Sequence, residues 1–377
     1  MLESEDEDMF TTSSDNEAEF RDAKYLYYEE DVKMDKKKKH TLRAFDRDTG
    51  GLSNEYQEKI LPKLMDSSNL FMEWAIEYNL LPLSARCPNA QKDPKCESPL
   101  ALIFADGLND LYQLKCSNCD NKESLRKHSI FYGLQCNIRS AIRILYGWVK
   151  GIDLDLMANI LGLDIETVGT LYNRASRFVR KAVTLHYPTL MTLGGEGVVV
   201  LVDIYPIFLQ KAGSQSHRCS PILCISEIGS LPQNYWLEPL EYWDNNDPFQ
   251  VKEIKAKILD IITNLVKPKS MLVLPSQTTF LFSEEMETLN KLYINVKYVD
   301  DLLDCNHRNR SLGAILDAIW KKPVEVCEQA QFFNPNYINQ YFVREFWIRT
   351  ADVDAFGILI DLISIETVRG NIDKLCL

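Results

Sequence analysis

Four cysteines have the spacing of a metal site. Two stand in CPNAQKDPKC and two in CSNC, and between these segments LALIF and LYQLKC flank the turn-like ADGLND, which predicts a β-hairpin. Cysteine pairs that bracket a hairpin are typical of a zinc ribbon, where tetrahedral thiolate ligation replaces a core too small to fold alone. The alternative is that these cysteines are incidental or buried. The expected ligands of a structural zinc ion are Cys87, Cys96, Cys116 and Cys119.

A second candidate is a lone acid in the apolar segment GGEGVVVLVDIYPIF. The β-branched run Val198–Val202 predicts a strand that is buried on both faces, and Asp203 follows directly. A carboxylate there is costly to bury without a partner. Either Asp203 turns back to solvent at the strand end, or it is the first metal-binding acid of a nuclease core.

Basic residues gather around a predicted helix-turn-helix in DLDLMANILGLDIETVGTLYNRASRFVRKAV. Gly162 permits the tight turn and Asp164 can cap the second helix. Residues 122–182 contain ten Lys and Arg against five Asp and Glu, which favours contact with nucleic acid, although such helices also serve for packing alone. The candidate DNA contacts are Arg126, Lys127, Arg174, Arg177, Arg180 and Lys181.

Composition limits the class of protein. The formal net charge of the 377 residues is -12, so any DNA contact requires a local basic patch. The acidic start lacks the pattern of a signal peptide, and no apolar run reaches the ~20 residues that span a membrane. Ten cysteines then indicate reduced thiols or metal ligands in the cytosol or nucleus. The lysines at 36–39 could form a nuclear-import signal or a solvated charge run.

The patterns predict a multidomain α+β chain. Few large aliphatic residues occur before about Gly51, so we expect that segment to be disordered. Strand-like segments alternate with helical ones beyond Gly194, which suits a mixed sheet with helical cover. The expected segments are an acidic tail at 1–52, a helix and zinc ribbon at 53–132, the helix-turn-helix at 133–190, an α/β core at 191–330 and C-terminal helices at 331–377.

The order of these motifs is more specific than any one of them. FMEWAIEYNLLPLSARCP is followed by the ribbon, RKHSIFYG, YGWVKG, LGLDIETVGTLYNRASR and GGEGVVVLVD. This order resembles the Merlin-type transposases, a DDE family with an ISXO-like transposase domain, over roughly Asn69 to Ile365. The resemblance implies an RNase H-like core that cuts and joins DNA with two divalent ions held by three carboxylates.

The chain departs from the family pattern at its acids. Asp203 matches the first acid, but Gln277 follows Ser276 where the family has Asp, and Asp317 before Trp320 replaces the usual Glu. A neutral amide is a poor ligand for a site that is built on charge. We therefore expect a degenerate site that binds no catalytic magnesium, in a domesticated transposase that is not an enzyme.

The resemblance and the charge pattern lead to one expected function and two alternatives. We expect a nuclear protein that binds DNA or chromatin and recruits protein partners through its degenerate core and acidic tail, with homo-oligomers possible and no membrane contact. One alternative is a pure protein-interaction scaffold that does not bind DNA. The other is an active nuclease that uses a substitute acid from Glu284, Glu285, Asp300 and Asp301.

Overall fold

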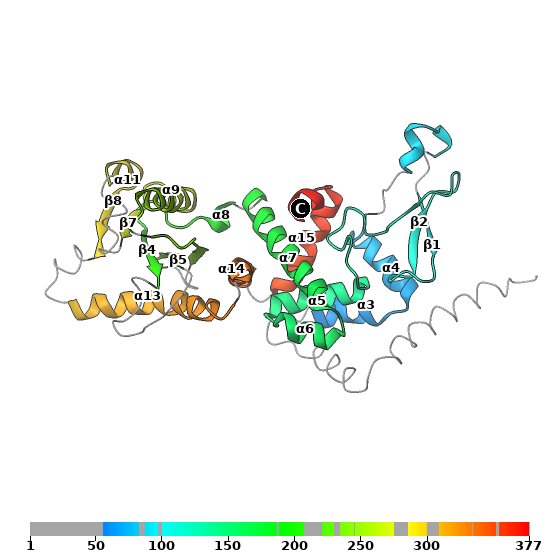
Figure 1. Ribbon diagram of the computed structural model, residues 1–377, viewed down its shortest axis with the longest axis horizontal. Coiled ribbons are helices and arrows are strands. Elements are labelled where there is room, and N and C mark those ends of the chain that lie inside the picture. Colours follow the sequence, from blue (N-terminus) through cyan, green and yellow to red (C-terminus); the bar gives the residue numbers. More distant parts are fainter. Residues whose placement is uncertain are drawn as a thin grey trace, which may run out of the picture. The chain divides into compact units, whose positions relative to one another are not determined.

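The chain forms two compact units of mixed α+β structure in a computed structural model (Figure 1). Unit 1 comprises Met1–Ala175 and Asp352–Leu377, and unit 2 comprises Ser176–Ala351. The structure describes residues 56–82, 87–96, 100–186, 188–206, 221–229, 234–244, 246–274, 286–299, 309–333, 335–351 and 354–376. The predicted acidic tail and the lysines at 36–39 lie outside these ranges. None of the helices in the described ranges is both long enough and apolar enough to cross a membrane.

Unit 1 has a helical core around one almost wholly buried helix, α5. Asn137 begins α5 by accepting a hydrogen bond from the Ser140 N–H, and Gly151 ends it with φ +73°. The rings of Tyr56 and Tyr146 stack with centroids 3.7 Å apart. The helical elements of this core are η1 (Tyr56–Ile60), α3 (Leu61–Met65), α4 (Ser68–Glu77), α5 (Ile138–Lys150), α6 (Leu154–Leu161), α15 (Ala355–Val368) and α16 (Ile372–Cys376).

A small antiparallel sheet carries the cysteine segments of unit 1. Its strands pair in the order β1-β2-β3, with Ala101 opposite Lys115 and Phe104 opposite Tyr112. The hairpin that the sequence predicted is therefore confirmed. The elements of this part are η2 (Pro88–Gln91), η3 (Pro94–Cys96), β1 (Ala101–Phe104), β2 (Tyr112–Lys115) and β3 (Lys122–Glu123).

The predicted helix pair is also present, as α6 and α7 (Ile165–His186). Gly162 ends α6 in the left-handed region at φ +67°, where a side chain would be strained. The Asp164 carbonyl accepts hydrogen bonds from the Thr167 and Val168 N–H groups and so starts α7. The apolar positions that periodicity assigned to the inside are buried, and they are Val168, Leu171, Tyr172, Phe178 and Val179.

Unit 2 is built on a five-stranded mixed sheet in the order β6-β5-β4-β7-β8. Neighbours β6, β5 and β4 pair antiparallel, whereas β4, β7 and β8 pair parallel. Figure 1 shows α9 and α13 on opposite sides of this sheet. The elements are α8 (Pro188–Met191), β4 (Val199–Tyr205), β5 (Ile222–Glu227), β6 (Tyr235–Pro239), α9 (Pro248–Leu265), β7 (Met271–Leu274), α11 (Met286–Leu292), β8 (Asn295–Tyr298), α13 (Asn309–Ala330) and α14 (Pro335–Ala351).

The two units divide the chain differently from the five segments that we expected. The segment 331–377 does not stay together, because α14 belongs to unit 2 whereas α15 and α16 belong to unit 1. Apolar contacts explain the split. Phe356 of α15 packs edge-on against Tyr56 and Tyr146, while Phe342 of α14 joins the core on β5 and β6. The ribbon and helix-turn-helix segments likewise share unit 1 up to Ala175.

Candidate metal centre and nucleic-acid interface

The four predicted ligand cysteines converge in unit 1. Their sulfur atoms all lie within 4.8 Å of one another, and the Cys87 and Cys119 sulfurs are 3.4 Å apart. Zn–S bonds of about 2.3 Å in a tetrahedron place sulfurs roughly 3.8 Å apart, so this spacing suits a zinc ion. We call these four residues the cysteine cluster. It could hold a metal ion such as zinc.

Local turns position the two halves of the cysteine cluster. Cys87 precedes η2 and Cys96 ends η3, whereas Cys116 follows β2. The Cys116 N–H donates to the Asn121 carbonyl at 2.9 Å, which closes the turn that carries Cys119. The Asn118 side-chain amide donates to the Lys95 carbonyl and joins the two halves. Contacts outside the sulfurs therefore help to fix the ligand geometry.

The surroundings act differently on the thiols of the cysteine cluster. The Asn89 side-chain amide donates to the Cys119 sulfur at 3.4 Å and is the main cause that lowers the pKa of Cys119 to about 6. Burial raises the pKa of Cys96 to about 12, and it also raises the pKa of Cys87. A cation at the centre would favour the thiolate form of every member.

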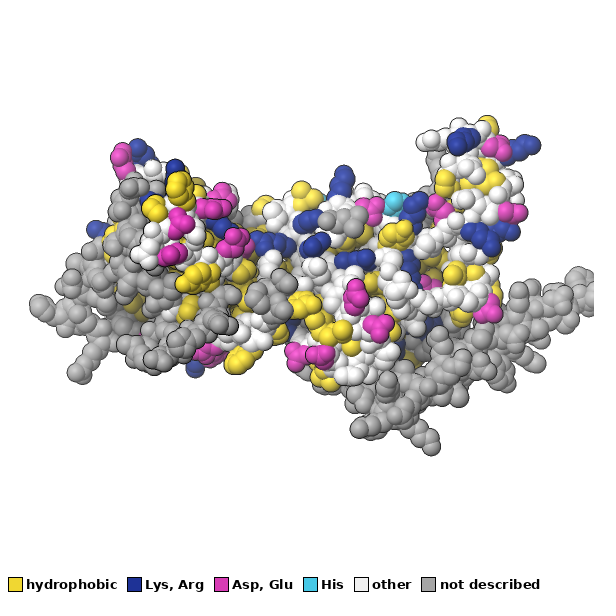
Figure 2. Space-filling model, in the orientation of Figure 1, with side chains coloured by type: hydrophobic (Ala, Val, Ile, Leu, Met, Phe, Trp, Pro, Cys, Tyr) yellow, Lys and Arg dark blue, Asp and Glu magenta, His cyan; other side chains and the backbone are white. Residues whose placement is uncertain are grey.

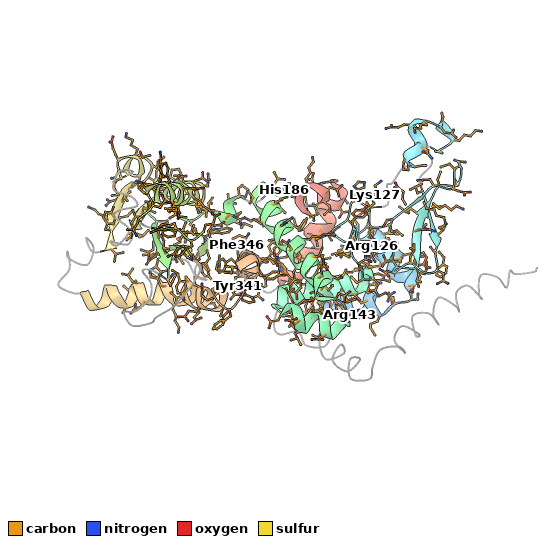
Figure 3. The ribbon with its side chains drawn as sticks, viewed as in Figure 1. Arg126, Lys127, Arg143, His186, Tyr341 and Phe346 are labelled. Atoms are coloured by element: carbon orange, nitrogen blue, oxygen red, sulfur yellow. The ribbon has the colours of Figure 1, made fainter. Side chains whose placement is uncertain are left out.

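Arg126, a predicted DNA contact, lies inside unit 1 instead of on its surface. Its side chain is 8% exposed and pairs with Asp110, which is equally buried. Its guanidinium also donates to the Leu134 and Cys136 carbonyls at 3.0 and 2.6 Å. Figure 3 shows Arg126 and Lys127 between the strands and the helices of unit 1. Because Arg126 satisfies its donors internally, we do not retain it as a DNA contact.

Two further predicted contacts also bind groups within their own units. In unit 1 the Arg174 guanidinium donates to the carbonyls of Ile130, at 3.0 Å, and Tyr132. In unit 2 the Arg180 guanidinium donates to both Glu238 carboxylate oxygens, at 3.0 and 3.2 Å. No local sequence pattern indicates these acceptors, because they lie 42 to 58 residues away from the arginines that they bind.

The remaining predicted contacts face solvent. Lys127 is 43% exposed and pairs with Glu123 at 2.9 Å, while Arg177 and Lys181 of α7 are exposed. Residues four apart on a helix share a face, so Arg177 and Lys181 present their charges together. Figure 2 shows Lys and Arg side chains over the part of the surface where Figure 1 draws α7.

The start of α7 has the opposite charge, a feature that our sequence reasoning missed. Residues 151–173 contain four acids and no Lys, Arg or His. Figure 2 shows acidic and apolar side chains intermixed over α6. In DNA-binding helix-turn-helix proteins the first residues of the second helix contact base edges, and acids there repel phosphate. Charge counted over this shorter window would have revealed it. The exposed acids are Asp153, Asp155, Asp164 and Glu166.

In unit 2, Asp203 lies within β4 and is 8% exposed, so it does not turn back to solvent. Its carboxylate accepts a hydrogen bond from the Ile204 N–H at 2.7 Å. Burial raises its pKa to about 7, against 3.8 for an ordinary Asp. Cys224 is its partner across the β4–β5 ladder. Asp203 forms no ion pair with any residue that the structure describes.

Asp317, the other acid of the expected triad, does not join Asp203 in any group of three or more possible metal ligands among the described residues. Asp317 is exposed on α13, whose later residue Cys327 packs its sulfur 3.7 Å from that of Cys224. Gln277 lies outside the described residues, as do the substitute acids Glu284, Glu285, Asp300 and Asp301. Within the described ranges, the cysteine cluster is the one place where three or more possible metal ligands meet.

No known protein family, curated protein or solved structure matches this chain. The resemblance to Merlin-type transposases therefore rests on the ordered motifs alone and stays a prediction.

Proposed function

We propose that this chain is a domesticated, transposase-derived nuclear protein that binds DNA or chromatin without cutting it. The cysteine cluster holds a structural zinc ion, and the degenerate core and acidic tail recruit protein partners. The observation that carries this proposal is the strand arrangement of unit 2. An RNase H-like core, which the resemblance implies, has three antiparallel strands followed by a helix and two parallel strands. β4, β5, β6, α9, β7 and β8 follow that order.

The acids support a role without cleavage. Two-metal cleavage needs several carboxylates around one site, because they position both cations and offset their charge. Asp203 stands on the central strand β4, but Gln277 contributes no charge at the second position. Asp317 is the third candidate and is exposed on α13. A site that lacks one of three charges is poorly suited to hold two divalent ions close together.

The mode of DNA contact that suits the surface is binding to phosphates. Arg177 and Lys181 project from one face of α7. In unit 1, Lys122 is exposed directly after the segment Cys116–Asn121, and Lys127 is 43% exposed. Such contacts carry little sequence information but supply most of the affinity at low salt. The acids at the start of α7 disfavour insertion of that end into a groove.

DNA binding is tested with a labelled duplex at several salt concentrations. We expect log Kd to rise linearly with log salt, and Arg177→Ala with Lys181→Ala to reduce that slope by about 2, one for each phosphate contact. Lys252→Ala with Lys257→Ala, which removes the same charge from exposed positions on α9, is the matched control and should change the slope little. Equal slopes for both double variants would rule out α7 as the contact.

Cleavage is tested by nicking of supercoiled plasmid with magnesium or manganese. We expect no nicking above that of the Asp203→Ala variant, because the charges that two cations require are incomplete. Nicking by the parent that is lost in Asp203→Ala would show a working active site and overturn the proposal.

A protein-interaction scaffold is the second candidate, and the surface at residues 151–173 favours it. The same segment carries four exposed acids and two exposed apolar residues, Leu156 and Ile165, which are 49% and 47% exposed. This end of the helix pair suits a protein partner better than it suits DNA. A parent protein without salt-dependent DNA binding in the first experiment would leave this candidate as the function.

A further inference from the structure

A cavity of about 410 Å³ opens in unit 1 beside the three-stranded sheet. One wall comes from the hairpin loop and β2, with Leu108, Asn109 and Gln113. The other wall is the segment 132–135, with Tyr132 and Gln135. This volume is within the range of small-molecule sites, roughly 300–1,000 Å³. None of the functions argued above uses it.

The wall that contains Tyr132 is held in place by two guanidinium groups. Arg126 and Arg174 each donate to two carbonyls of the segment 130–136, so alternate carbonyls along it are bound. The acceptors are the carbonyl oxygens of Ile130, Tyr132, Leu134 and Cys136. Asp110 in turn accepts from Arg126 and from the Ile138 N–H. The cavity is therefore formed before any ligand arrives, which reduces the entropy lost on binding.

The lining is aromatic and amide-rich, and its charged residues other than Lys122 are paired. Tyr132 is 55% exposed, although its backbone carbonyl accepts a hydrogen bond from Arg174. The buried charge of Arg126 is matched by Asp110, and Glu123 pairs with Lys127. Asn109, Gln113 and Gln135 supply both donors and acceptors. A planar, uncharged group with hydrogen-bonding edges fits this lining, while Lys122, an exposed lining residue, suits an attached phosphate.

We propose that this cavity receives one unstacked base of a single-stranded nucleic acid, with the base stacked on Tyr132 and its edge bound by the amides. Bases that leave a stack are recognised by stacking on aromatic rings and by hydrogen bonds to their exposed edges. The inference rests on the proposed function, since nucleic acid is the ligand in both. In this arrangement Arg126 and Arg174 are positioning residues, because they hold the segment 130–136 that carries Tyr132.

The experiment compares a labelled 20-nucleotide single strand with its duplex, by fluorescence anisotropy on the full chain. We expect Tyr132→Ala to weaken single-strand binding by roughly 5- to 100-fold, the effect of losing one stacked base. Tyr132→Phe, which keeps the ring, should stay within about twofold of the parent because stacking needs no hydroxyl. Duplex binding should be unchanged by all variants. Tyr242→Ala, at an aromatic position of unit 2 that is 85% exposed, is the control.

The outcomes separate this inference from the proposed function. If duplex binding is normal but Tyr132→Ala holds the single strand as tightly as the parent does, the base site is wrong and the proposed function stands. If the parent binds neither form, both are wrong. The third outcome is that the parent binds the single strand, while Tyr132→Phe weakens this binding as much as Tyr132→Ala does. Stacking on the ring would then not hold the base, and the base site would again be wrong.

Discussion

Unit 1 and unit 2 both bury groups that could do chemistry, but among the described residues only unit 1 gathers three or more possible metal ligands. The four thiols of the cysteine cluster lie within 4.8 Å of one another, and the charge of Arg126 is met by Asp110. Asp203 of unit 2 is as buried as Arg126, yet no ion pair forms to it from the described residues. Burial instead raises its pKa to about 7.

The difference shows that burial alone does not make a site. A buried charge is tolerated when opposite charges or hydrogen-bond partners converge on it, and otherwise the group tends to become neutral. In unit 1 the four thiols lie together and Arg126 pairs with Asp110. The first arrangement suits a structural metal ion, and the second holds the cavity wall in place. Unit 2 places Asp203 on its central strand, and the residues described there form no group of three or more possible metal ligands around it.

The largest effect should come from removing the metal ligands. We expect one zinc ion per chain by elemental analysis, and we expect Cys116→Ser with Cys119→Ser to abolish binding. Loss of the ion should unfold the ribbon, because structural zinc supplies about 10 kcal/mol or more in small domains. The measurement is zinc content together with thermal unfolding.

Cys136→Ser is the matched control, since Cys136 is buried in unit 1 but lies outside the cysteine cluster. It should keep its zinc. If the protein contains no zinc, or if the double variant is as stable as the parent, the cysteine cluster is not a structural zinc site. Unit 1 would then not differ from unit 2 in this respect.

The next effect should come from breaking the buried pair of unit 1. Arg126→Ala leaves Asp110 charged and buried without its partner, and it frees the Leu134 and Cys136 carbonyls. We expect the free energy of unfolding to fall by roughly 3 to 5 kcal/mol, as measured by urea denaturation. Lys127→Ala removes the same charge from a half-exposed neighbour and should cost less than about 1 kcal/mol. Equal losses would contradict the internal role of Arg126.

The smallest effect should come from Asp203, and it depends on pH. Because its folded pKa of about 7 exceeds the ordinary 3.8, the folded state keeps a proton that the unfolded state has released between these values. Stability therefore falls as pH rises from about 4 to 7. Asp203→Asn cannot ionise, so it should be more stable than the parent by roughly 2 to 4 kcal/mol at pH 8 and by little at pH 4.

The measurement is urea unfolding of parent and variant across this pH range. Asp317→Asn changes an exposed acid on α13 and serves as the control. A parent that gains stability toward pH 8 relative to Asp203→Asn would mean that a partner stabilises the ionised carboxylate.

The amino-acid sequence determined the local features of this protein. The hairpin between the cysteine segments and the turn at Gly162 could be predicted, as could the inward face of α7 from Val168 to Val179. Each depends on residues only a few positions apart, through turn preferences and helical periodicity. The cysteine spacing predicted the cluster as well, because the hairpin between CPNAQKDPKC and CSNC brings the two cysteine pairs together.

Only the tertiary structure decided which charges face solvent. Arg126, Arg174, Arg177 and Arg180 look alike in sequence, but three of them donate to internal acceptors and Arg177 is exposed. The acceptors of Arg174 and Arg180 are 42 residues or more away along the chain, so no local pattern marks them. The C-terminal helices divide between the units for the same reason, since Phe356 packs on Tyr56, the first residue that the structure describes. Whether a side chain is exposed or bound internally thus depends on which segments, distant in sequence, fold against it.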